Sequence, residues 1–417
     1  MNPCVIIPTF WTGRRNRVPN NVLAVYDHPT PIDSDGTLPA CLRSLQEVEG
    51  VERVVVTVAA TDPSIEHAAE DRVREILADI PGMDAFVFGP AEIGSLHRRM
   101  EQLEFADMIP GVNLVGYGAV RNVGLIAAAV LGSEAVLFID DDQIIDDPAF
   151  FTKAFEGLGM RLDDGKAILA KTGYYTDEDG RYQRHADPQW ADMFWRREDA
   201  FNEALAMVDR PPRMTPSTVA FGGCLALHRD MYCNVSFDPW VVRGEDIDYV
   251  INVRMHGGDV FLDGEWSVIH RPPRLPSEAL QFRQDVYRFV YEHRKIEFAK
   301  SQVDLRQVTP ESMEPYPGRF MSSSVVWRAV ATAMLRGVSR RSEGGRYFRV
   351  ARAAVKDASE YARQNCHNYF DFQRRWPMFL DRIWDDIALR SLFSGERRVD
   401  RAAITGRFPQ IRHDTKR

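Results

Sequence analysis

Short apolar runs alternate with segments of helical periodicity from the N-terminus to about residue 275. The apolar runs predict strands at 5–7, where Pro8 closes the strand, and at 54–58, 85–88, 135–139 and 266–269. Between them, apolar residues at helical spacing predict helices at 38–45 and 119–131, and a polar helix ends near Ile80. Such alternation is typical of a mostly parallel sheet with helices on its faces. We therefore expect an α/β fold for this part of the chain.

The pattern changes at a proline-rich break, residues 271–276, which stops regular structure. Beyond the break, helical periodicity predicts helices at about 277–300, 322–341, 345–364 and 376–394, followed by a basic tail from Arg397 that we expect to be mobile. These patterns divide the chain into an α/β domain at 1–275 and a helical C-terminal region at 276–417.

The helix expected at 322–341 combines apolar residues with four arginines. One interpretation is peripheral contact with a membrane surface, near a lipid-linked acceptor. We favour the other, in which an amphipathic helix packs on its own domain or on a second subunit, which would make the protein a homo-oligomer.

Composition changes this picture little. The chain has 417 residues, of which 45% are apolar and 27% charged, as in ordinary globular proteins. A formal net charge of -8 argues against a nucleic-acid partner. The five cysteines are scattered, and no two of them form a C-x-x-C pair, so the sequence indicates neither a zinc knuckle nor a disulfide framework. This cysteine usage favours a cytoplasmic location. The sequence shows no signal-peptide pattern and no apolar run of about eighteen residues, so we expect no transmembrane segment.

Three consecutive carboxylates, Asp140, Asp141 and Asp142, follow the apolar strand predicted at 135–139. Ligands of open α/β sheets bind outside the carboxyl ends of the strands. Adjacent like charges repel, and a hard divalent cation such as Mg²⁺ or Mn²⁺ removes that repulsion while bridging carboxylates to a diphosphate. A solvated acidic turn is the alternative interpretation.

Two further clusters carry charge at predicted helix starts. Arg121 and Asn122 lie near the beginning of a helix, where an anion is attracted by the helix N-terminus and by arginine. Glu245 and Asp246 begin another helix, where a carboxylate beside an acceptor hydroxyl can act as a general base. Ordinary helix starts, with first-turn acids that favour the helix dipole, explain either cluster as well.

The last candidates lie around the proline-rich break and before it. His270 follows a strand and is a plausible metal ligand, although a lone histidine is more often structural. Arg271 and Arg274 beside it could meet phosphate oxygens. Gly222 and Gly223 form a segment where a backbone can approach a ligand closely, or simply a turn before a strand.

The order of these motifs resembles that of family 2-like glycosyltransferases with the GT-A fold. The resemblance covers about residues 4–271 and rests on Ile7-Pro8-Thr9, the Leu-x-x-Cys-Leu-x-Ser-Leu helix at 38–45, the Ala-x-Arg-Asn-x-Gly-Leu helix at 119–125, the Asp-x-Asp motif at 140–142 and the Glu-Asp motif at 245–246.

The resemblance implies a metal-dependent transfer of a sugar from a nucleoside-diphosphate donor to the hydroxyl of a saccharide or another acceptor, with inversion. It implies that Asp142 and His270 hold Mn²⁺ or Mg²⁺, and that Asp246 is the base, with Glu245 second. The donor side would comprise Pro8, Thr9, Arg121, Asp140, Asp141 and Arg271, and the acceptor side Gly222 and Gly223.

Two departures leave the donor open between a UDP-sugar, which we favour, and a GDP-sugar. The second strand of the family ends in Asp-Asp-Gly-Ser, whereas here Ala59, Ala60 and Thr61 precede Asp62. The polar loop at 11–36 is longer than in the family and would cover the donor, hold the acceptor or lie on the surface.

Three alternatives stand beside this hypothesis. Related GT-A enzymes with a histidine ligand retain the anomeric configuration. A sugar nucleotidyltransferase shares the architecture but usually has a glycine-rich loop after its first strand, which residues 12–15 match poorly. A non-catalytic nucleotide-sugar-binding scaffold would not need acids at both 140–142 and 245–246.

Overall fold

The computed structural model describes residues 1–14, 19, 21–163, 165–185, 189–273, 277–340, 342–384 and 386–391. Arg274 and the basic tail from Arg397, which the sequence singled out, lie outside these residues, as do positions 15–18 and 20 of the long polar loop. The strands are β1 (Pro3–Thr12), β2 (Thr30–Pro31), β3 (Val54–Ala60), β4 (Ala85–Phe88), β5 (Ala135–Phe138), β6 (Gln143–Ile144), β7 (Ala170–Thr176), β8 (Met214–Pro216), β9 (Leu225–His228) and β10 (Val260–His270).

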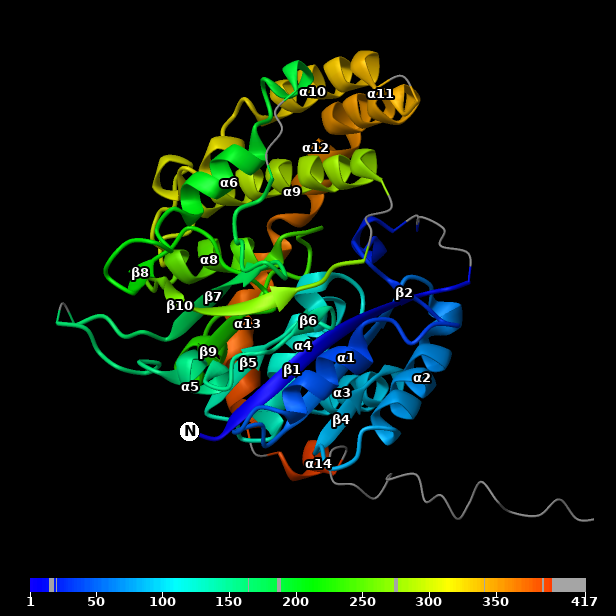
Figure 1. Ribbon diagram of the computed structural model, residues 1–417, viewed down its shortest axis with the longest axis vertical. Helices are drawn as coiled ribbons and strands as arrows, with labels where there is room; N and C mark the ends of the chain where they lie inside the picture. Colours follow the sequence, from blue (N-terminus) through cyan, green and yellow to red (C-terminus); the bar gives the residue numbers. More distant parts are fainter. Residues whose placement is uncertain are drawn as a thin grey trace, which may run out of the picture.

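Helices surround this sheet and continue beyond it (Figure 1). They are α1 (Leu38–Gln46), α2 (Glu66–Ala78), α3 (Pro90–Gln102), α4 (Tyr117–Val130), α5 (Phe150–Phe155), α6 (Arg197–Leu205), α7 (Arg229–Tyr232), α8 (Glu245–Met255), α9 (Glu278–Ala299), α10 (Val325–Ser339), α11 (Gly344–Ala353), α12 (Ser359–Asn365), α13 (Asn368–Ile383) and α14 (Ile387–Arg390).

The described strands form one mixed sheet in the order β4-β3-β1-β5-β9-β7-β10-β6, with β2 added to β1 and β8 to β10. The half from β4 to β5 is parallel, whereas β9 runs antiparallel to both of its neighbours. The α/β architecture with flanking helices and a helical C-terminal region, predicted from the sequence, is confirmed. Because β1 and β5 are parallel neighbours, their carboxyl ends open on the same edge of the sheet.

Burial explains why the central elements take these forms. Every residue of β3 is buried, as expected for a β-branched strand covered by helices on both faces. In α4 all residues except Tyr117 are buried, and a Cβ on Gly124 would lie 2.5 Å from Ile6 Cγ2, so this helix packs directly on β1. Small residues in α4 therefore serve close packing of helix on sheet.

Some predicted boundaries are wrong. The first strand does not end at Pro8 but continues to Thr12, because Pro8 needs no amide donor where it pairs with Thr57. The last predicted helix, 376–394, covers the second half of α13, which begins at Asn368 and ends at Ile383, and the short helix α14. The helix predicted at 345–364 consists of α11, one π-helical turn at Ala354–Ala358 and α12. No sequence pattern predicted α3.

The helical region packs on the sheet-bearing part as well as on itself. Figure 1 shows α10, α11 and α12 together at one end of the molecule, while α13 returns to the half that holds the sheet. One hydrophobic cluster contains both Phe138 of β5 and Trp376 of α13. The division at about residue 275 stays a prediction, and the apolar core extends across it.

Helix α10 packs on its own chain, through buried positions that include Val325, Ala329 and Ala333. Its Arg336 donates to Asp192 Oδ1 at 2.6 Å, so this cation also points inward. Trp327 of the same helix is 54% exposed. Among the described residues, no helix is long and apolar enough to cross a membrane.

Candidate active site

A cavity of about 430 Å³ lies at the carboxyl ends of β1 and β5. Its other walls are the starts of α4 and α8 and one face of α9. Eight of the residues singled out in the sequence line it: Pro8, Arg121, Asp140, Asp141, Asp142, Glu245, Asp246 and His270. These residues come from five separate stretches of the chain. The fold therefore brings both predicted acidic clusters, the arginine and the histidine into one site.

The three aspartates diverge as soon as β5 ends. Asp140 accepts hydrogen bonds from Arg121 Nη2 at 3.0 Å and from the Tyr175 hydroxyl at 2.8 Å. Asp141 accepts one from Thr9 Oγ1 at 2.6 Å, and burial, followed by the charge of Asp142, raises its pKa well above the ordinary range. A cation at this acidic run would favour ionisation of Asp141, because it offsets the negative charge of Asp142.

Arg121 is buried and bridges the two acidic clusters. Its Nε donates to Glu245 Oε1 at 2.7 Å, its Nη1 to the Gly222 carbonyl at 2.9 Å and its Nη2 to Asp140. Three protein acceptors therefore share the guanidinium that the resemblance assigned to the donor diphosphate. Arg121 fixes the distance between the acidic run and the start of α8, whatever else it binds.

The two acids at the start of α8 differ in their surroundings. Glu245 is buried, and burial raises its pKa to about 7 although Arg121 opposes the shift. Asp246 is only half-buried, and its Oδ2 accepts a hydrogen bond from the Gly222 amide at 3.1 Å. Both acids line the cavity, and Asp246 is the more exposed of the two.

The donor atoms near Asp142 fit a divalent cation. Asp142 Oδ2 and His270 Nε2 lie 3.2 Å apart, and His28 is close enough that both residues affect its pKa, which burial lowers. The buried Nδ1 of His28 makes no hydrogen bond within the described residues. No group of three or more acidic, histidine or cysteine residues among those described could hold a metal, so most ligands of a cation here would be oxygens of water or diphosphate.

The remaining predicted residues adjoin the cavity without lining it. Thr9 donates the hydrogen bond to Asp141 described above, and Arg271 forms an ion pair with Glu178. A Cβ on Gly222 would collide with Arg121, and one on Gly223 would lie 2.6 Å from Asp140 Cγ. The sequence predicted that the backbone at these two glycines can approach a ligand closely. In the structure this backbone lies close to side chains of the site.

Sequence reasoning missed several residues of the site. The Tyr175 hydroxyl donates a hydrogen bond to Asp140 and accepts one from the Gly223 amide at 2.7 Å. The cavity is also lined by His28, Arg243 and Arg288. Tyr175 and Arg288 lie inside a regular strand and helix without a motif, so only the fold identifies them. Asp62, by contrast, caps a short helix by accepting from the Ser64 amide.

No protein-family model matches the chain, and a comparison with curated proteins finds no match. Among solved structures, the chain is similar to a mannosyltransferase, PcManGT from Pyrobaculum calidifontis, in complex with GDP-Man and Mn²⁺, with a TM-score of 0.47 and 13% identity over 90% of this chain and 86% of that one. It is similar to glucosyl-3-phosphoglycerate synthase from Mycobacterium tuberculosis in complex with Mn²⁺ and UDP-glucose, with a TM-score of 0.36 and 16% identity over 68% of this chain and 77% of that one.

A third similar structure is GalNAc-T7 with UDP, GalNAc and Mn²⁺, with a TM-score of 0.38 and 11% identity over 70% of this chain and 51% of that one. These are glycosyltransferases, the class that the sequence motifs predicted.

Proposed function

We propose that the chain is a glycosyltransferase that moves a sugar from a nucleoside-diphosphate donor, a UDP-sugar before a GDP-sugar, to an acceptor hydroxyl. The observation that carries the proposal is the meeting of Asp140–Asp142 and His270 with Glu245 and Asp246 in one cavity of about 430 Å³. A scaffold would need neither the second acidic cluster nor the arginine that ties it to the first.

The donor diphosphate would lie beside Asp142 and His270, which would hold Mn²⁺ or Mg²⁺. When bound, the cation would supply positive charge against the leaving diphosphate. Asp140 would contact the nucleoside, because Arg121 and Tyr175 hold its carboxylate at the cavity wall. The half-buried Phe10, which packs 4.9 Å from the ring of Tyr117, offers an aromatic edge for the base.

Asp246 would act as the general base. The bond between the anomeric carbon and the diphosphate breaks, a bond from that carbon to the acceptor oxygen forms, and the hydroxyl proton passes to Asp246. The diphosphate leaves with the bonding electrons. Attack from the face opposite the leaving group inverts the anomeric carbon.

Replacement of the base tests this function. With each of several UDP- and GDP-sugars and Mn²⁺, we expect release of nucleoside diphosphate by the wild-type chain and loss of activity on metal chelation. Asp246→Asn should lower kcat by about 10²-fold or more, the usual contribution of a general base, while the donor Kd changes little.

Glu245→Gln is the matched variant, since that acid is tied to Arg121. Near-normal turnover in Asp246→Asn, with loss in Glu245→Gln, would move the base to Glu245. The anomeric proton coupling of the product separates inversion from retention. Release of inorganic diphosphate from a nucleoside triphosphate and a sugar phosphate would instead support a nucleotidyltransferase.

A further inference from the structure

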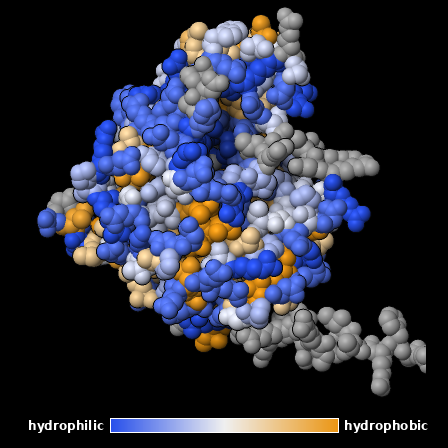
Figure 2. All heavy atoms as spheres, viewed as in Figure 1, coloured by the Kyte–Doolittle hydropathy of each residue, from blue (hydrophilic) through white to orange (hydrophobic). Residues whose placement is uncertain are grey.

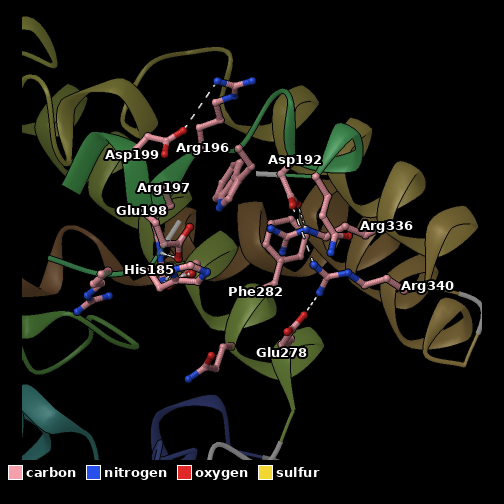
Figure 3. Close-up of a pocket in the computed structure, with 15 residues that line it drawn as sticks. His185, Asp192, Arg196, Arg197, Glu198, Asp199, Glu278, Phe282, Arg336 and Arg340 are labelled. Atoms are coloured by element: carbon pink, nitrogen blue, oxygen red, sulfur yellow. Dashed lines mark hydrogen bonds and ion pairs between the residues drawn. The ribbon is translucent and has the colours of Figure 1, made fainter. Parts of the chain in front are cut away.

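A second cavity, of about 560 Å³, adjoins the candidate active site on the side of the helical region. Its walls come from the segment before α6, from α6 itself and from α9 and α10. Figure 3 shows Arg336 and Arg340 on one side of this cavity and Arg197, Glu198 and His185 on the other. The two cavities share Arg184, Arg197, Gln281 and Asp285, so they meet at these side chains.

Arginines surround the one carboxylate at this junction. Asp285 accepts hydrogen bonds from Arg197 and, at 3.0 Å, from Arg243 Nη1. Burial alone would raise the pKa of Asp285, but the charges of Arg197, Arg243, Arg288 and Arg184 together hold it below its ordinary value. A negative charge at this junction is therefore close to several arginine side chains at once.

Most of these arginines have acidic partners of their own. Arg243 pairs with Asp27 at 2.8 Å, and Arg288 donates to Glu292 at 2.8 Å. The second Nη of Arg288 is buried and has no hydrogen-bond partner in the described part of the chain. This arginine consequently keeps an unused donor beside the active-site cavity, which it lines.

Arg184 differs from the others. Its guanidinium lies 4.2 Å from the centre of the Phe201 ring, and within the described ranges it forms no ion pair with a carboxylate. The residue is exposed, and its backbone amide donates to Asn202 Oδ1 at 2.8 Å, which ties this segment to α6. An accessible arginine without a carboxylate, held among other arginines, favours binding of an anionic ligand.

We propose that the acceptor is an anionic alcohol, a hydroxyl compound that carries a phosphate or carboxylate group. Its anion binds Arg184 at the junction, its hydroxyl reaches Asp246 in the active-site cavity, and its remaining atoms occupy the second cavity. The proposal rests on the proposed function for the role of Asp246, while the anion site stands on its own contacts. The sugar bond forms as described above, and the acceptor anion takes no part in bond making.

Binding of small hydroxy anions to the full chain tests the proposal. Glycerol 3-phosphate and D-glycerate are the anionic probes, glycerol is the neutral control and inorganic phosphate the control without a hydroxyl, each titrated calorimetrically with UDP, GDP and Mn²⁺ present. We expect at least one hydroxy anion to bind and glycerol not to bind. The stronger of the two anions identifies the phosphate or the carboxylate as the group recognised.

Arg184→Gln should weaken binding of that anion at least tenfold, and Arg184→Lys should restore part of it, because the charge returns without the planar fork. Arg181→Gln is the matched control, since Arg181 belongs to the same segment, is exposed and pairs with Asp179. We expect it to bind as the wild type does. Thermal melting of each variant confirms that it is folded.

Three results would overturn the proposal. The first is failure of both hydroxy anions to bind the wild-type chain, and the second is equal binding of the hydroxy anion by Arg184→Gln. The third is weakened nucleoside-diphosphate binding in Arg184→Gln, which would assign Arg184 to the donor. If nucleoside diphosphate binds and the hydroxy anions do not, the acceptor proposal fails and the proposed function survives. If the anions bind through Arg184 and no nucleoside diphosphate binds, the proposed function fails instead.

Discussion

Three acceptors share the guanidinium of Arg121, and two of them are the carboxylates of Asp140 and Glu245. Removal of one of these carboxylates should destabilise the protein, because it would leave a buried charge without compensation. At the scale of single residues, the site therefore depends on charges that are neutralised inside the protein. In our proposal it depends also on Asp142 and Arg184, which would bind ligands.

Glu292 gives a prediction at the same scale. It is fully buried in α9, and burial raises its pKa from an ordinary value of 4.5 to about 7, although Arg288 opposes the shift. The folded chain thus binds this proton more tightly than the unfolded chain. Its contribution to stability is present below about pH 4.5 and is lost as the pH rises to about 7.

Glu292→Gln should remove that dependence, so that its free energy of unfolding falls less than that of the wild type between pH 4.5 and pH 7, by on the order of 2 kcal/mol. Urea unfolding at several pH values measures it. Glu297→Gln, on the same helix, is the contrast, because its hydrogen bond from Lys300 lowers the pKa. An unchanged pH dependence in Glu292→Gln would contradict the assignment.

At the scale of elements, the ends of strands and the starts of helices position the chemistry. The segment after β5 delivers the aspartates, the end of β10 delivers His270, and α8 begins with Glu245 and Asp246. The Gly222-Gly223 turn before β9 lets these parts approach one another, since any side chain there would displace Arg121 or Asp140.

Gly223→Ala tests this role of the turn. Its methyl group would lie 2.6 Å from Asp140 Cγ and fall on the Gln143 amide, so we expect a loss of about 1–3 kcal/mol in stability and weaker donor binding. Gly345→Ala in α11 is the control, because a Cβ there meets no atom within 4 Å. Thermal unfolding and donor titration of both variants decide. Unchanged donor binding in Gly223→Ala would show that Asp140 does not need this packing.

The sequence predicted the elements that carry a strong pattern. The β-branched run of β3 and the alanine- and glycine-rich α4 were found near their true bounds. Motifs also identified the acids, Arg121 and His270. Tyr175 and Arg288 of α9 could not be found this way, because their part in the site depends on long-range packing. The start of α13 was missed because aromatic residues at 368–372 show no simple helical stripe.

At the scale of the whole molecule, the helical region completes both the core and the cavities. Hydrophilic residues cover most of the face shown in Figure 2, and hydrophobic residues form smaller patches. Helix α13 is anchored through Gln373, whose Oε1 accepts from the Ser236 amide at 2.8 Å and from its hydroxyl at 2.7 Å. The Trp376 indole donates to the Tyr232 carbonyl at 2.8 Å.

We therefore expect the chain to unfold as one unit. Gln373→Ala would leave two buried donors of Ser236 without a partner and should cost about 1–3 kcal/mol, with fluorescence and circular dichroism transitions shifting together. Arg374→Ala, its exposed neighbour, should change stability by less than about 1 kcal/mol. A shift confined to one of two separate transitions would mean that the parts on either side of residue 275 unfold independently.

The most direct test of the proposed function is calorimetric titration of the full chain with UDP, GDP, ADP and CDP, each with and without Mn²⁺. We predict that one of them, UDP first, binds the wild-type chain in a Mn²⁺-dependent way, and that Asp142→Ala loses at least tenfold of that affinity while remaining folded. Failure of all four to bind the folded wild-type chain, or equal binding by Asp142→Ala, would contradict the assignment of this cavity to a nucleoside-diphosphate donor.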